Sequence, residues 1–191
     1  AVVVSYNREE LLAECLAGID RQTRQPDHLI VVDNASTDGA LGVARRFAAR
    51  TAIPTRVVAL PRNVGGAGGF TAGIALAVEP LMQPLGPHES GAGYRMGGYE
   101  PQPGLVHDVW LMDDDTVPLP NALEELLRAS DACVAQNGRV PVALGSKAIW
   151  TDGREHLMNK PRPRTHPAEG GTKLRGLPSA YQTRSLSFVS C

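Results

Sequence analysis

The sequence lacks a basic excess, a long apolar run and a regular cysteine pattern. Its 19 lysines and arginines stand against 20 aspartates and glutamates, a formal net charge of -1, so we expect no nucleic-acid partner. No apolar run approaches the ~20 residues of a membrane-spanning helix, and no signal-peptide pattern opens the chain. The three cysteines (Cys15, Cys133 and Cys191) are scattered without metal-ligand spacing, which favours a reducing compartment over a disulfide framework.

The composition that remains is typical of a globular protein, with 42% hydrophobic and 20% charged residues in 191. This length predicts one domain over residues 1–191. Strand-like residues stand at both ends, in 1–5 and in 186–191. We therefore expect the chain to be part of a longer polypeptide, truncated at both ends.

The most informative stretch is an acid triplet, Asp113 to Asp115, that directly follows the apolar residues 109–112. The apolar run predicts a buried strand, and Pro118 prevents its continuation. Three adjacent carboxylates repel one another, which raises their pKa values unless a cation such as Mg²⁺ or Mn²⁺ relieves the repulsion. The alternative is a solvated acidic turn that caps a helix over residues 121–129.

Three earlier segments (1–5, 28–32 and 56–60) also predict strands, and each precedes a polar loop and a helical pattern. Successive units of this kind give an α/β fold with a mostly parallel sheet and helices on both faces. The loops after the strands then share one edge of the sheet with the acid triplet, where open α/β sheets bind ligands.

The first two loops have both structural and ligand-binding interpretations. Asn7 is a candidate N-cap with Glu10 as its capping-box partner, or a ligand-binding residue. Asp33, at the tip of its strand, suits hydrogen bonds to a nucleotide ring or ribose, whereas Ser36 and Asp38 are candidate caps of the second helix.

The third loop carries four glycines in residues 65–69, which let a backbone approach a ligand closely. It is not a dinucleotide fingerprint, because Thr71 occupies the third glycine position, and it lacks the Gly-Lys-Ser/Thr of a Walker loop.

The rest of the chain gives weaker signals. Residues 82–107 are rich in glycine and proline without a clear period, and we interpret them as a long loop insertion. Residues 140–158 predict a β-hairpin around the turn Asp152-Gly153. Residues 159–178 are basic and proline-rich, and predict either an acceptor-side loop or a solvated one.

Three motifs in order, at residues 2–8 (VVVSYNR), 32–39 (VDNASTDG) and 112–115 (MDDD), resemble family 2 inverting glycosyltransferases of the GT-A fold. The resemblance covers most of residues 1 to about 130. Residues 22–33, 62–70 and 110–115 are further similar to the galactofuranosyltransferases that build actinobacterial cell-wall galactan. Rhamnosyltransferases that use dTDP-rhamnose share the general motifs.

The resemblance implies a role for each matched position. Asp33 would hold the uracil ring, and Asp113 and Asp115 would bind Mn²⁺ or Mg²⁺ as an Asp-x-Asp (DXD) pair. The residues implied in nucleotide-sugar binding are Ser5, Tyr6, Asn7, Arg8, Asp33, Asn34, Asn63, Gly65, Gly66, Asp113 and Asp114.

The implied function is metal-dependent, inverting transfer of galactofuranose from UDP-galactofuranose to a cell-wall glycan or lipid-linked acceptor. The family takes its catalytic base from a later motif that we do not find before Cys191, so we expect the base beyond it. The alternatives are a dTDP-rhamnose-dependent rhamnosyltransferase and a nucleotide-sugar-binding fragment without catalysis. A sugar nucleotidyltransferase ranks last, because it needs a basic glycine-rich loop where Tyr6-Asn7-Arg8 stands. We expect a cytoplasmic location, while peripheral attachment to the inner membrane face and self-association stay open.

Overall fold

The structure, a computed structural model, describes residues 1–78, 108–141, 143–146 and 148–154, and in addition the backbone of four short strands. The chain divides into two compact units. Unit 1 comprises residues 1–21 and 25–118, and unit 2 comprises residues 22–24 and 119–191. The expectation of a single domain stays a prediction.

Unit 1 is built on a four-stranded sheet in the order β3-β2-β1-β6. Its strands are β1 (Val2–Ser5), β2 (Leu29–Asp33), β3 (Thr55–Ala59) and β6 (Leu111–Asp113). All neighbours are parallel, with Val4 opposite Val32 in β2 and opposite Asp113 in β6. The valine and isoleucine content of β1 and β2 suits central strands that are buried on both faces. The expected parallel sheet is confirmed.

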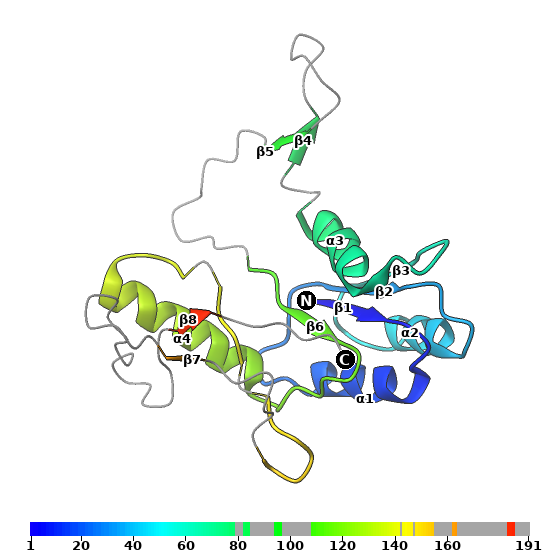
Figure 1. Cartoon of the computed structure of the whole chain (residues 1–191), viewed down its shortest axis with the longest axis horizontal. Helices are drawn as coiled ribbons and strands as arrows, with labels where there is room; N and C mark the ends of the chain where they lie inside the picture. Colours follow the sequence, from blue (N-terminus) through cyan, green and yellow to red (C-terminus); the bar gives the residue numbers. More distant parts are fainter. Residues whose placement is uncertain are drawn as a thin grey trace. The chain divides into compact units, whose positions relative to one another are not determined.

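Helices cover both faces of this sheet, as predicted (Figure 1). On one face, α1 (Glu9–Asp20) and α2 (Ala40–Ala48) pack against Val3 and Val31. On the other face, α3 (Gly65–Val78) packs against Val2, Val4, Ile30 and Val32. Each fully buried aliphatic side chain of this kind contributes about 1.5–3 kcal/mol.

Helix α3 approaches the sheet closely because glycines face it. A Cβ atom added at Gly73 would meet the Val2 side chain, and one added at Gly69 would meet that of Val4. The expected loop assignment of residues 65–69 is wrong, because α3 already begins at Gly65, and Gly69 serves helix–sheet packing.

Unit 2 contains α4 (Ala122–Asn137) and the strands β7 (Arg162–Pro163) and β8 (Thr183–Ser185). The helix is longer than the expected 121–129. Its first-turn amide, the N–H of Leu123, donates to Oε1 of Gln22 at 3.0 Å. The cap of this helix is thus a glutamine remote in sequence, and not the acid triplet of the alternative interpretation.

Two other expectations need correction. Residues 140–150 do not form a strand where they are described, since only Ile149 makes a β-bridge. The expected turn is present at Thr151 to Gly153, and the N–H of Trp150 donates to the Arg154 carbonyl across it. The returning strand lies largely outside the described residues. Within the expected loop insertion, β4 (Met82–Pro84) pairs with β5 (Tyr94–Met96) in antiparallel fashion. The remainder of residues 82–107 is outside the described ranges. The same is true of residues 159–161, 164–178 and Cys191.

Candidate functional site

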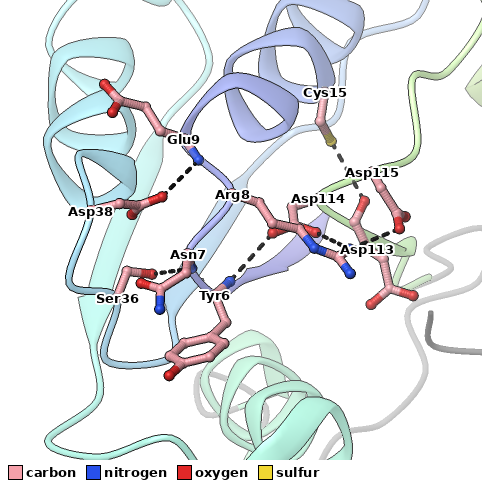
Figure 2. Close-up of polar contacts among 10 residues, drawn as sticks. All are labelled: Tyr6, Asn7, Arg8, Glu9, Cys15, Ser36, Asp38, Asp113, Asp114 and Asp115. Carbon is pink, nitrogen blue, oxygen red and sulfur yellow. Dashed lines mark hydrogen bonds and ion pairs between the residues drawn. The ribbon is translucent and has the colours of Figure 1, made fainter.

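The carboxyl ends of β1 and β6 form a topological switch point of the sheet. From β1 the chain proceeds to β2 and β3 on one side, and β6 then lies on the other side of β1. In open α/β sheets, ligands bind in the crevice at such a point. The loop after β1 carries Tyr6, Asn7 and Arg8, and β6 ends in Asp113, so the sequence-predicted residues of these two segments come together (Figure 2).

Arg8 joins the loop after β1 to the acid triplet. Its Nη1 donates to Oδ1 of Asp114 at 3.2 Å and to Oδ2 of Asp115 at 2.8 Å. The main-chain N–H of Tyr6 donates to the second oxygen of Asp114 at 3.3 Å. Both carboxylates raise the pKa of Arg8, outweighing the opposing effect of burial. The family resemblance implied that Arg8 lies in the site, but it did not predict the pairing with Asp114 and Asp115.

Asp114 and Asp113 have different environments. Asp114 is buried, and both of its oxygens accept hydrogen bonds. Asp113 is half-buried, and among the described residues its carboxylate has no hydrogen-bond partner. Burial, then the charges of Asp115 and Asp114, raise the pKa of Asp113, and Arg8 opposes the shift only in part. Negative charge at Asp113 is therefore not fully compensated by the protein.

This imbalance fits a divalent cation held by Asp113 and Asp115. In the part of the chain that the structure describes, no three histidine, cysteine, aspartate or glutamate side chains gather as a metal cage. Mg²⁺ is nevertheless usually held by one or two carboxylates together with substrate phosphates and water. Two carboxylates at the edge of a sheet meet that requirement, so the residues present fit the implied metal.

Asn7 ties the loop after β1 to the loop after β2. It adopts φ = 50°; its N–H donates to Oγ of Ser36 at 3.0 Å, and its Oδ1 accepts the N–H of Thr37 at 2.7 Å. The prediction that Asn7 caps α1 with Glu10 is wrong, since Arg8 holds the N-cap position without a side-chain cap. The reason is that Oδ1 of Asn7 is used by Thr37 instead.

Asp38 caps two helices at once. Its Oδ2 accepts the N–H of Glu9 at the start of α1, and its Oδ1 accepts the N–H of Ala40 at the start of α2, both at 3.0 Å. Gly39, and not Asp38, holds the N-cap position of α2, but Asp38 accepts the first amide of that helix as the expected cap would. The cap of α1 was missed, because nothing in the linear pattern shows that a residue of another loop lies there.

Asp33 and Ser5 are neighbours in register at the ends of β2 and β1. Both are buried, at 2% and 1% exposure. Oδ2 of Asp33 accepts the N–H of Ser36 at 3.2 Å, whereas Oδ1 of Asp33 and Oγ of Ser5 have no hydrogen-bond partner within the described residues. Buried polar atoms are normally satisfied, so these two atoms indicate a missing polar partner.

Asn34 organises the loop after β3. Its Oδ1 accepts the N–H of Val64 at 2.9 Å, and its Nδ2 donates to Oδ1 of Asn63 at 3.0 Å and to the Gly65 carbonyl at 3.1 Å. Oδ1 of Asn63 also accepts the N–H of Gly65, which has φ = 74°. The predicted residues Asn34, Asn63 and Gly65 thus meet, and Gly66 follows in the first turn of α3; their contact with a donor stays a prediction.

Cys15 lies behind the acid triplet and was not expected there. Its Sγ is 3.8 Å from the Asp113 carbonyl and 3.8 Å from Sδ of Met112. Burial, followed by the charges of Asp114, Asp115 and Asp113, raises its pKa to about 12. The thiol therefore stays neutral and acts as a packing group. A separate groove of about 480 Å³ between α1 and α2, lined in part by Leu16, Val43 and Phe47, includes none of the predicted site residues.

Comparison with known proteins relates the amino-terminal part of the chain to glycosyltransferases. Residues 1–84 match the family described as Glycosyl transferase family 2. Two proteins named galactofuranosyltransferase GlfT1 are similar over 78 residues, one from Mycolicibacterium smegmatis at 42% identity and one from Mycobacterium tuberculosis H37Rv at 44%. Less than half of the chain, its amino-terminal segment, is thus similar to glycosyltransferase family 2.

These matches are partial. They cover 41% of this chain and span only 24–25% of the length of those relatives. The family match ends at residue 84, before the acid triplet. The place of the triplet in the candidate site therefore rests on its own sequence and geometry.

Two solved structures are also similar to parts of the chain. A mannosyltransferase of Pyrobaculum calidifontis in complex with GDP-Man and Mn²⁺ is 31% identical, with a TM-score of 0.35 over 37% of this chain and 21% of that one. S. aureus TarS 1–349 in complex with UDP is 20% identical, with a TM-score of 0.47 over 68% and 31%. Within the described ranges, none of the helices has the length and apolar content to cross a membrane.

Proposed function

We propose that this chain is the donor-binding part of a metal-dependent inverting glycosyltransferase that uses UDP-galactofuranose. The observation that carries the proposal is the convergence of Arg8, Asp33 and the acid triplet at the carboxyl ends of parallel strands β1, β2 and β6. Such an edge offers oxygen ligands for a cation, hydrogen-bond acceptors for a nucleoside and a guanidinium for phosphates. These are the groups that a nucleoside diphosphate sugar requires.

The nucleoside is assigned to the strand ends at Ser5 and Asp33. A uracil ring N–H can donate to a carboxylate, and Oδ1 of Asp33 is buried without a partner among the described residues. A ring N–H that donates to this oxygen would satisfy it, and the site would then select a base that presents an N–H. Uracil and thymine both do so, and this carboxylate therefore does not by itself separate UDP from dTDP.

The cation is assigned to Asp113 and Asp115, and Mn²⁺ or Mg²⁺ has the oxygen preference of this pair. When bound, the ion supplies a positive charge that stabilises the diphosphate as it leaves the sugar. Arg8 contributes a second, fixed positive charge at the same edge. Asp114 holds Arg8 and the loop after β1 in place through both of its oxygens.

The choice of galactofuranose rests on the two mycobacterial relatives, whose name states that transfer. Inverting transfer also requires a base for the acceptor hydroxyl, worth about 10²–10⁴-fold in rate, and we assign no residue of this chain to that role. We further propose that the protein acts in the cytoplasm, where nucleotide sugars arise, on a glycan or lipid-linked glycan acceptor at the inner face of the membrane.

A competition experiment tests the donor assignment. With the 191-residue chain and Mn²⁺, displacement of a fluorescent UDP derivative by UDP, dTDP, GDP and UDP-galactofuranose gives their relative affinities. We expect UDP and UDP-galactofuranose to displace the probe most effectively. Preference for dTDP would move the function to rhamnosyl transfer, and binding of UDP-galactofuranose without transfer to any glycan acceptor would leave a nucleotide-sugar-binding fragment.

A further inference from the structure

We propose that Arg8 is an internal cation that competes with the divalent metal ion for Asp115, and that this competition couples metal binding to donor binding. The inference rests on the proposed function, since it concerns the same metal and the same donor. It adds a cause for weak metal binding in the free protein, namely that the Arg8 guanidinium occupies one of the two carboxylates that would hold the ion.

The ion pairs that Arg8 makes with Asp114 and with Asp115 differ in how firmly they are held. The Asp114 side chain is 5% exposed and receives a second hydrogen bond from Tyr6 N–H. The Asp115 side chain is 32% exposed, and its Oδ2 is held by Arg8. If Arg8 moved away from Asp114, the buried Asp114 carboxylate would lose its compensating charge, which is costly in free energy. Asp115 is therefore the carboxylate that Arg8 can release.

Charge explains why release requires a donor. Three carboxylates and one guanidinium leave the triplet with an excess of negative charge. A divalent ion at Asp113 and Asp115 corrects that excess, but it would lie beside the guanidinium, and like charges in close proximity repel each other. An anionic diphosphate that contacts both the ion and Arg8 removes this repulsion and gives the guanidinium a new bidentate partner.

The coupling has a thermodynamic consequence that can be measured. If the nucleotide strengthens metal binding by a given factor, the metal strengthens nucleotide binding by the same factor. Substitution of Arg8 by an uncharged residue should raise the affinity for metal alone and reduce this factor. A residue that merely shaped the site would weaken both bindings and would leave no gain for the metal.

The experiment is a titration of Mn²⁺ into the 191-residue chain, with free Mn²⁺ measured by electron paramagnetic resonance, without and with saturating UDP. The variants are Arg8→Gln, which retains a polar side chain without charge, and Arg8→Lys, which retains the charge. Arg128→Gln is the charge-matched control, because Arg128 pairs with Glu125 on the surface of α4. Circular dichroism establishes that each variant is folded.

For the wild type we expect UDP to strengthen Mn²⁺ binding by a factor within about 5–150, the usual range for coupled sites. Arg8→Gln should bind Mn²⁺ at least about threefold more tightly than the wild type without UDP. Its coupling factor should be smaller than that of the wild type, because only the direct attraction between the ion and the diphosphate remains. Arg8→Lys and Arg128→Gln should stay near the wild type. If Arg8→Gln does not fold, a coupling factor in Arg8→Lys equal to that of the wild type supports the role of charge.

Two results would overturn the inference. Unchanged or weaker Mn²⁺ binding by folded Arg8→Gln without UDP would reject the competition while leaving the proposed function in place. Absence of Mn²⁺ and UDP binding in the wild type would reject the proposed function, and this inference with it. The two failures are distinguished by the wild-type titration alone.

Discussion

Oδ1 of Asn7 accepts the main-chain N–H of Thr37 at 2.7 Å, which fixes the loop after β1 against the loop after β2. The residue that makes this contact has φ = 50°, a left-handed conformation that asparagine tolerates better than most residues. Sequence position 7 is therefore restricted by geometry as well as by any contact with a donor.

Asn7→Ala should lower the free energy of unfolding by about 2 kcal/mol, because it removes hydrogen bonds and places a Cβ-bearing residue without a local polar group at positive φ. Asn7→Gly loses the same hydrogen bonds but accepts the backbone conformation, so its loss should be smaller by about 1 kcal/mol. Urea denaturation measures both. Equal losses would show that the backbone conformation contributes nothing.

Asp38→Ala should be more destabilising than the loss of an ordinary cap, since one carboxylate serves the first turns of both α1 and α2. We expect a loss of about 1–3 kcal/mol. Asp131→Ala, at an exposed position of α4, is the control and should change stability by no more than about 0.5 kcal/mol. A loss of that small size in Asp38→Ala would contradict the double cap.

Gly73→Ala should destabilise unit 1 by about 1–3 kcal/mol, because the added methyl group meets the Val2 side chain inside a packed layer. Gly42→Ala is the matched control in α2, where the added group meets only the flexible end of Arg46. There the better helix propensity of alanine should stabilise by up to about 1 kcal/mol. Opposite signs in thermal or urea unfolding would confirm the close approach of α3.

The raised pKa of Asp113 predicts a pH dependence with a definite sign. The folded protein holds this proton more tightly than the unfolded chain does, so the contribution of Asp113 to stability falls as pH rises from 3.8 through the raised pKa. Asp113→Asn, which resembles the protonated form, should be more stable than the wild type at pH 7. The difference should vanish below the ordinary aspartate pKa.

The same variant should lose metal binding, because an amide replaces a carboxylate ligand. Mn²⁺ should stabilise the wild type at pH 7 and leave Asp113→Asn unchanged in thermal unfolding. Equal stabilisation of both proteins would show that Asp113 is not a ligand of the metal ion.

The strands of the site could be predicted from the sequence because their signals are local. Apolar runs mark β1, β2 and β6, and polar residues follow each of them, so the edge of a parallel sheet was expected to gather Asp33, the loop with Asn63 and Gly65, and Asp113. Periodicity also located α1 and α2. These properties depend on neighbouring residues along the chain.

The contacts that fix the site could not be predicted, because they depend on which loops become neighbours. The register that sets Val4 opposite Asp113 is needed before Arg8 can be matched with Asp114 and Asp115. The same holds for the cap of α4, because the carboxamide of Gln22 that accepts the N–H of Leu123 is far away in sequence. The predicted strand at 140–150 was wrong because an apolar run suits several structures when packing does not select one.

The most direct test of the account is calorimetric titration of UDP into the chain at neutral pH, first with Mn²⁺ and then with EDTA. The account predicts saturable UDP binding with Mn²⁺ that is lost on chelation, and its loss in Asp115→Ala under both conditions. UDP binding of equal strength with EDTA, or in Asp115→Ala, would contradict a metal-bridged diphosphate site at Asp113 and Asp115.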